Sequence, residues 1–226
     1  MTVAALLPLL HLCDSLFPTG AFGHSDGLEW ATDRALVHTA ADLGAWMDGS
    51  LSGVLACSDG PAVNLAWHAF RERDWDALSI VNADSWALRP SAAARQATRA
   101  MGARLARTWH QLYEPAGFDE MFRGLDVDRT MTLPAAFGVV CASAGAEARA
   151  AVEAFVYTRL ASAASAAMRL MPIGQREAHR VLASRLRAAG PIVDSAVARS
   201  SVSGFAPALD IASMSHQYVH SRLFRS

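Results

Sequence analysis

The sequence predicts an all-α protein, a single-domain multi-helix bundle of antiparallel helices. Alanine, the strongest helix former, occurs 46 times among the 226 residues. Strict alternation of apolar and polar residues is rare, and the clusters of Val, Ile and Tyr that are typical of strands are scarce. Connections between the predicted helices are short except around residues 114–132, which favours antiparallel neighbours.

Helix-start signals punctuate the first half of the chain. We interpret Ser25 with Glu29, and Thr39 with Asp42, as capping boxes that start helices. Pro61 stands where the first turn of a helix tolerates proline. The predicted helices of this half span 25–37, 39–57, 61–70 and 75–88.

The second half is also helical. Ser91 can cap a helix, Pro134 can open another, and the run of small residues at 161–168 suits a close helix crossing, internal or across a dimer. Residues 114–132 are predicted to be a loop region that can hold a short helix at 118–122. The remaining predicted helices span 92–112, 147–171, 175–189 and 207–220.

Composition excludes several classes of function. The formal net charge is −1 and the pI about 6.7, so no basic excess is available for nucleic acid or for an anionic membrane surface. All 20 basic residues are arginine, which excludes a phosphate-loop lysine and a Schiff-base lysine. The longest charge-free stretch, 130–146, is too short and too broken by Pro and Gly to span a membrane.

The cysteines and the chain ends indicate a cytoplasmic protein that docks on others. Cys13, Cys57 and Cys141 are an odd, widely spaced set, so free thiols are expected. Within a single domain, 1–226, residues 1–24 are apolar without the basic start of a signal peptide, and we interpret them as a docking segment. Residues 221–226 alternate arginine with Leu and Phe and form a predicted docking tail. Both segments are expected to become ordered on a partner.

Histidines supply the candidates for chemistry. His216 and His220 are four residues apart on a predicted helix and could face one metal ion, but HQYVH lacks a third ligand, so no metal site is assigned. His24, with Asp26 and Glu29 nearby, could be a general acid or base, yet no nucleophile motif accompanies it. No catalytic residue is therefore assigned.

Three segments, in order along the chain, carry patterns that capping alone does not explain. The first is Pro18, Gly20, Ala21, Phe22, Ser25, Gly27, Leu28 and Glu29; the second is Arg169–Gln175; the third is Pro207–Ser213 with His216 and Ser221–Ser226. Together with residues 132–140 they resemble the UreF family of urease accessory proteins over nearly the whole chain. Gln217, His220 and Arg169 stand where relatives often have Glu, Tyr and Lys.

The resemblance implies an all-α, non-catalytic, cytoplasmic protein that forms a homodimer. It implies binding to a UreD-type (also called UreH) accessory protein, recruitment of the GTPase UreG, and delivery of nickel to apo-urease. The chain itself is expected to hold no cofactor, because nickel is handled by the complex.

The resemblance also suggests which residues bind partners. Leu223, Phe224 and the segment 10–22 are expected to dock on the UreD-type protein. The face with Tyr157 and Arg169, and the turn 172–175, are expected to serve the dimer and UreG. The full set of expected partner-binding residues is Gly20, Phe22, Ser25, Gly27, Glu29, Tyr157, Arg169, Pro172, Gly174, Gln175, Arg222, Leu223, Phe224 and Arg225.

Other hypotheses remain open at this point. One is a nickel-binding metallochaperone that uses His216 and His220. Another is a helical enzyme that uses His24 with Glu29. A third is a regulator that inserts an arginine into the UreG site, and a checkpoint that slows GTP hydrolysis is equally compatible with the sequence.

Overall fold

The computed structural model describes residues 3–225, without the side chains of residues 3, 4 and 22. Predictions that concern residues 1–2, the Phe22 side chain and Ser226 lie outside the described part. Within that part every regular element is a helix and none is a strand, which confirms the all-α prediction.

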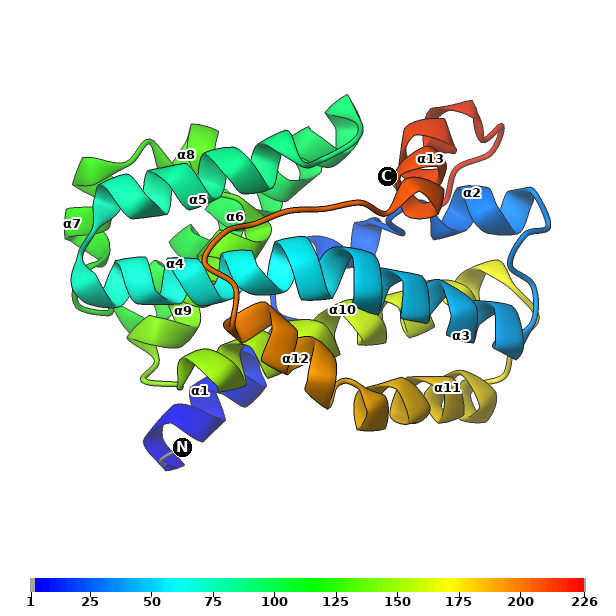
Figure 1. Ribbon diagram of the computed structural model, residues 1–226, viewed down its shortest axis with the longest axis horizontal. Coiled ribbons are helices and arrows are strands. Elements are labelled where there is room, and N and C mark those ends of the chain that lie inside the picture. The colour runs from blue at the N-terminus through cyan, green and yellow to red at the C-terminus, as the bar shows by residue number, and fades with distance from the viewer. Residues whose placement is uncertain (1–2, 226) are drawn as a thin grey trace.

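Most helices are joined by short connections, but residues 198–206 form a long extended connection across the molecule (Figure 1). They are α1 (Val3–Cys13), α2 (Leu28–Asp33), α3 (Ala40–Gly49), α4 (Gly60–Glu72), α5 (Trp75–Ala87), α6 (Ala92–Tyr113), α7 (Phe118–Gly124), α8 (Val127–Thr130), α9 (Leu133–Ser143), α10 (Ala148–Leu170), α11 (Gln175–Ala188), α12 (Gly190–Val197) and α13 (Pro207–Ser215). Two short 3₁₀ turns, η1 (Ala21–Gly23) and η3 (His216–Tyr218), and a π-helical segment, η2 (Ser50–Asp59), complete the set.

Helix α9 is the centre of the core. Its residues from Leu133 to Ala142 carry no charge and are all buried, so the helix is enclosed rather than amphipathic. It packs against α4, α5, α6 and α10. The closest approach is at Gly138, where an added Cβ would lie 2.2 Å from the carbonyl oxygen of Val63 on α4. A glycine at this crossing therefore sets the separation of the two central helices.

Helices α3 and α4 are joined by the π-helical segment into one continuous rod (Figure 1). The predicted break between residues 57 and 61 is therefore wrong. At the end of the wide segment the Gly60 N–H donates to the carbonyl of Leu55, five residues earlier. The wider turn accommodates the Pro61 ring, which would meet the carbonyl four residues earlier in a regular α-helix.

Local capping chemistry places several helix starts where the sequence predicted them. Thr39 and Asp42 form the capping box, with Asp42 N–H donating to the Thr39 hydroxyl at 3.1 Å. The Ser91 hydroxyl accepts from Ala94 N–H at 3.0 Å and starts α6. Helices α5, α6, α10 and α11 match their predicted ranges to within about two residues, and α9 begins next to Pro134 as predicted. Helix α7 confirms the short helix in the 114–132 region.

Other predicted boundaries are wrong. Helix α2 begins after Gly27 and ends at Asp33, since Ala35 has a positive φ of 57° that no α-helix continues through. Gly190 and Pro191 open α12 instead of only ending α11, because proline at the first turn sacrifices no helical hydrogen bond. The sequence also missed the short helix α8. Helix α13 ends at Ser215, short of the predicted His220.

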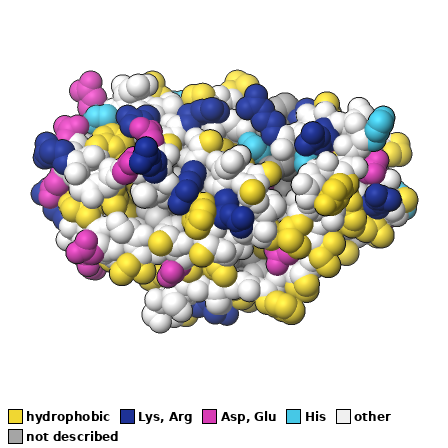
Figure 2. All heavy atoms as spheres, turned by 90° about the horizontal axis from the view of Figure 1, so that it is seen from above, with side chains coloured by type: hydrophobic (Ala, Val, Ile, Leu, Met, Phe, Trp, Pro, Cys, Tyr) yellow, Lys and Arg dark blue, Asp and Glu magenta, His cyan; other side chains and the backbone are white. Residues whose placement is uncertain are grey.

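Charge is unevenly distributed over the surface. Figure 2 shows acidic side chains gathered toward the end of the molecule that holds α7, while arginine side chains run across the middle of the face seen from above.

Both chain ends are packed on the body: α1 contacts α10, and the C-terminal segment returns to lie beside α2 and α13 (Figure 1).

We predict that Gly138→Ala destabilises the fold by about 3 kcal/mol, because the new methyl group would overlap the Val63 carbonyl in a core that cannot expand. Gly49→Ala is the matched control, since Gly49 is helical and has no atom within 4 Å of an added Cβ. It is expected to raise stability by about 0.5–1 kcal/mol. Urea unfolding followed by circular dichroism measures both; equal effects of the two substitutions would contradict this account of the α4–α9 crossing.

Candidate partner-binding site

A buried carboxylate, Glu29 on α2, ties the C-terminal tail (residues 219–225) to the body. Its Oε2 lies 2.6 Å from Nε2 of His216 and accepts from Phe224 N–H at 3.2 Å. Its Oε1 accepts from Leu223 N–H at 2.5 Å. Glu29 is only 4% exposed and His216 3%. Three donors thus compensate a charge that has been removed from water.

The start of α2 explains why Glu29 points inward. The Ser25 hydroxyl accepts from Glu29 N–H at 3.4 Å, while the carboxylate turns toward the tail instead of closing the predicted capping box. Gly27 has a φ of 85°, and an added Cβ there would lie 2.8 Å from the backbone nitrogen of Ser213 on α13. Only glycine suits both the positive φ and the lack of space for a Cβ, and it lets α2 and α13 cross closely.

The tail buries Val219 and Phe224 and exposes its other side chains. Phe224 is 5% exposed, and the Arg169 guanidinium lies 4.3 Å from its ring centroid in a cation–π contact. Arg225 N–H donates to the Gly23 carbonyl at 2.8 Å. Leu223 is 54% exposed, and Arg222 is also exposed. The sequence predicted that this tail becomes ordered on a partner, which stays a prediction. In the structure the tail is also held by contacts within the chain.

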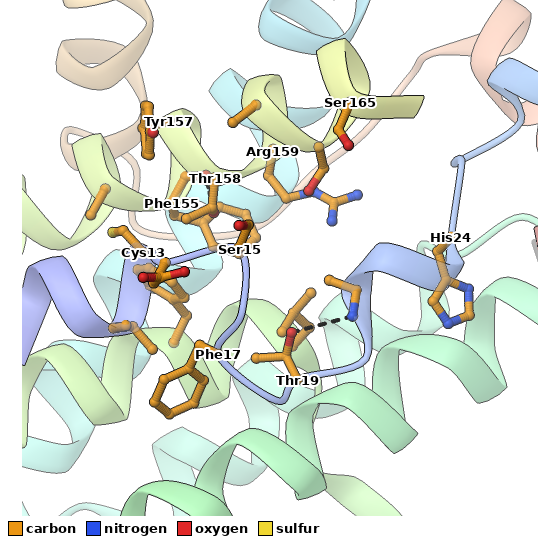
Figure 3. A pocket seen from close by; sticks show the side chains of 18 of the residues that line it. Cys13, Ser15, Phe17, Thr19, His24, Phe155, Tyr157, Thr158, Arg159 and Ser165 are labelled. Atoms are coloured by element: carbon orange, nitrogen blue, oxygen red, sulfur yellow. Dashed lines mark hydrogen bonds between the residues drawn. The ribbon is translucent and has the colours of Figure 1, made fainter. Parts of the chain in front are cut away.

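A cavity of about 770 Å³ opens beside the tail, between the end of α1, the following loop and α10 (Figure 3). One wall is apolar, with Leu9, Phe17 and Phe137. The α10 wall carries hydroxyl groups spaced on one helix face, which are those of Thr158, Ser162 and Ser165. Phe224 lines the same cavity, so the tail forms part of its wall.

Guanidinium groups gather at one end of this cavity. Arg159, largely buried, pairs with Asp26, and its burial lowers its pKa to about 10. Burial, then the charges of Arg159, Arg225 and Arg104, lower the pKa of His24 to about 4. His24 is therefore neutral at pH 7, and the charges of three arginines act on it. Such an edge suits an acidic group of a partner rather than proton donation by the histidine.

The structure brings together only part of the predicted set. Gly20, Tyr157, Arg169 and Phe224 line the cavity. Pro172, Gly174 and Gln175 are exposed in the connection between α10 and α11 and do not line it. Ser25, Gly27 and Glu29 are buried and contact the chain itself, so they shape the tail rather than face outward. Whether any of these residues binds a partner stays a prediction.

The histidine predictions need correction. The helix stops before His216, which turns inward to Glu29, whereas His220 is exposed; the shared helix face proposed for a metal is not formed. Within residues 3–225 no group of three or more His, Cys, Asp and Glu side chains could hold a metal ion. The carboxylate of Glu29 is engaged by His216 and the tail, so the proposed use of His24 with Glu29 loses its geometry.

The three thiols are free, as predicted. Burial raises the pKa of Cys13 to about 11, and burial also raises the pKa of Cys141 well above its usual value. Neither thiol is thereby activated as a nucleophile. Among the helices described, none has the length and apolar character needed to cross a membrane.

Sequence reasoning missed the pairing of Glu29 with His216 and the cluster around Arg159. The partners come from segments 187 and 133 residues apart. No local spacing marks either pair. The weak signal available was a glutamate at an apolar helix start together with a histidine shortly before the chain end.

Comparisons with known proteins agree with this architecture. A family model described as UreF matches residues 37–185. The urease accessory protein UreF of Methylobacillus flagellatus is 30% identical over 225 residues, which cover 98% of both chains. This chain belongs to the UreF family.

Further relatives extend the match over the complete UreF-family chain. The urease accessory protein UreF of Dechloromonas aromatica is 29% identical over 228 residues, covering all of this chain and 99% of the relative. The bifunctional urease accessory protein UreEF of Bordetella bronchiseptica is 35% identical over 98% of this chain, which spans 52% of that relative. Glu29 and the tail lie outside the segment matched by the UreF model but inside the full-length similarity.

We predict that acid destabilises this UreF-family protein partly through His24. Between the ordinary histidine pKa of about 6.5 and the folded value of about 4, the unfolded chain binds a proton that the folded chain does not. Stability therefore falls as the pH drops through this window, by about 1–2 kcal/mol after allowance for solvent screening of a partly exposed ring.

Urea unfolding at pH 7 and pH 4.5 measures the effect. His24→Asn should lose less stability over this interval than the wild type. The exposed His38, changed to Asn, is the control and should show the wild-type difference. A pH dependence unaltered in His24→Asn would show that the histidine ring is not held neutral.

Proposed function

We propose that this UreF-family protein is a cytoplasmic scaffold that joins a UreD/UreH-type accessory protein to a UreG-type GTPase. In this role it couples the GTPase to nickel insertion into apo-urease. It needs no catalytic residue and no cofactor of its own for that role, because the cargo is handled by the complex. Membership of the UreF family and the names of its relatives as urease accessory proteins support the proposal.

The observation that carries the proposal is the exposed surface of the C-terminal tail and α13. Large apolar side chains are exposed to solvent there, namely Ile211, Met214, Tyr218 and Leu223. Arg222 and Arg225 flank Leu223. Exposed apolar groups rimmed by arginine are typical of protein–protein interfaces. We assign this face to the UreD-type protein.

A second surface supports contacts with a like subunit and with UreG. Tyr157 is exposed on α10, a helix whose second half is rich in alanine and serine and so allows close approach. The connection between α10 and α11 presents Pro172, Gly174 and Gln175 to solvent. We assign α10 to the homodimer and this connection to UreG.

We predict that Leu223→Asp weakens binding to the UreD-type protein at least about 30-fold, as loss of an interface anchor does. The chain is co-expressed with a UreD-type protein and UreG, and the purified material is run on size exclusion with nucleotide present. The wild type is expected to elute as a ternary complex. Leu223→Asp should elute without the UreD-type protein while keeping its helical circular dichroism.

Leu112→Asp is the matched control for this experiment. Leu112 on α6 is 55% exposed, almost the same as Leu223, but lies far from the tail in the sequence. It should behave as the wild type. A wild-type chain that folds and forms no complex would refute the scaffold proposal, and equal loss in both variants would place the contact elsewhere.

We also predict that Gly174→Val impairs recruitment of UreG about 10-fold without lowering the melting temperature. Gly174 has φ −75° and ψ 152°, which any residue adopts, and an added Cβ would meet no atom within 4 Å. The side chain would project into the surface assigned to UreG.

Gly27→Val gives the contrast. Its positive φ and the nearby Ser213 backbone predict a large drop in thermal stability. Thermal melting and pull-down with UreG are measured for both variants. If Gly174→Val melts as early as Gly27→Val, Gly174 is a structural residue and the assignment of this connection to UreG fails.

A further inference from the structure

We infer that Glu29 and His216 are positioning residues, a buried latch that holds the C-terminal tail in its binding conformation. The latch determines that Phe224 faces the body and Leu223 faces a partner with an apolar centre and an acidic rim. The part of this inference that concerns binding rests on the proposed function. The part that concerns the tail conformation does not.

The hydrogen bonds of the carboxylate are all used inside the protein. Oε1 receives Leu223 N–H, and Oε2 receives Phe224 N–H and faces His216 Nε2. A carboxylate with 4% exposure has almost no access to water, so these donors are what makes its burial tolerable. Removing the acceptors would leave donors on two different segments without partners.

The tail backbone depends on this acceptor because it is neither helical nor paired in a sheet. Residues 219–225 have no regular structure, so their N–H groups must find partners outside a helix ladder. Two successive N–H groups, from Leu223 and Phe224, point at one carboxylate. Both N–H groups therefore share one carboxylate as their acceptor. It fixes the orientation of both residues at once.

The orientation decides what the surface presents. With the backbone held, Phe224 packs beside Arg169 in the cavity wall and Leu223 is left in solvent. Arg222 and Arg225, on either side, are exposed. An apolar side chain between two guanidinium groups fits a partner surface that has an apolar pocket and carboxylates at its edge.

His216 joins this latch to α13. It follows the last residue of α13, and Ala212 and Ser213 of that helix rest on Gly27 just before Glu29. The exposed side chains Ile211 and Met214 therefore stand on an element that shares the latch with Leu223. The buried Glu29 carboxylate thus sets how α13 and the tail are placed relative to each other.

Glu29→Gln tests the inference with the full-length chain. Glutamine keeps the shape of the side chain but replaces one acceptor oxygen by an N–H₂ donor, so at least one tail N–H loses its partner. Hydrogen exchange is measured by NMR or mass spectrometry. We expect exchange at Leu223 and Phe224 to accelerate about 10- to 100-fold, as expected for loss of a hydrogen bond to a charged group, while α9 stays protected. Binding to the UreD-type protein should weaken in parallel.

Glu72→Gln is the matched control, because Glu72 is an exposed glutamate at the end of α4. It should leave exchange and binding unchanged. If Glu29→Gln does not fold, His216→Asn replaces it, since the shorter side chain removes the Nε2 contact and keeps a polar group. Its expected result is acceleration of several-fold confined to the tail and α13.

Two results would overturn the inference. Tail exchange unchanged in Glu29→Gln would show that Phe224 packing alone holds the tail. Equal acceleration in α9 and the tail would show a general structural role without a latch. Selective acceleration in the tail supports the latch even when the wild type binds no UreD-type protein, an outcome that would overturn only the proposed function.

Discussion

The enclosure of α9 is the constraint on which the remaining structure depends. A helix without charges cannot face water over its length, so α4, α5, α6 and α10 must surround it. Gly138 then sets how closely α4 can approach. With the centre fixed, the amphipathic outer helices and both chain ends have defined places on the surface. The candidate site is made of those ends and of one face of α10, rather than of the core.

The site joins two kinds of interaction. One is packing, because the Phe224 ring is buried beside Arg169. The polar contacts of Glu29 add direction, because hydrogen bonds specify which way a backbone faces and apolar contacts do not. Around the neighbouring cavity, Arg159 pairs with Asp26, and burial together with the charges of nearby arginines lowers the pKa of His24. Both arrangements support the proposal that this chain recognises another protein.

Much of the fold was predictable because it is encoded locally. The Thr39–Asp42 box, the Ser91 cap and the proline at the start of α9 are read within one helical turn. The failures have two physical causes, which are local backbone geometry and contact between distant segments. Pro61 looks like a break, yet a π-helical turn carries the chain through it. Glu29 and His216 look like a cap and half of a metal pair, yet each is the partner of the other. The family resemblance predicted the tail as a docking segment but did not show its contacts within the chain.

The ordered tail has a thermodynamic consequence. When a segment folds only on its partner, the surface that it buries by folding adds to the heat-capacity change of association. The segment also loses conformational entropy when it binds. Here the backbone of Leu223 and Phe224 is already bound to Glu29. A partner that docks on Leu223 meets a preorganised surface, so the heat-capacity change should reflect the interface area alone. The association rate would then depend on diffusional encounter and desolvation, and not on the rate at which a disordered tail folds.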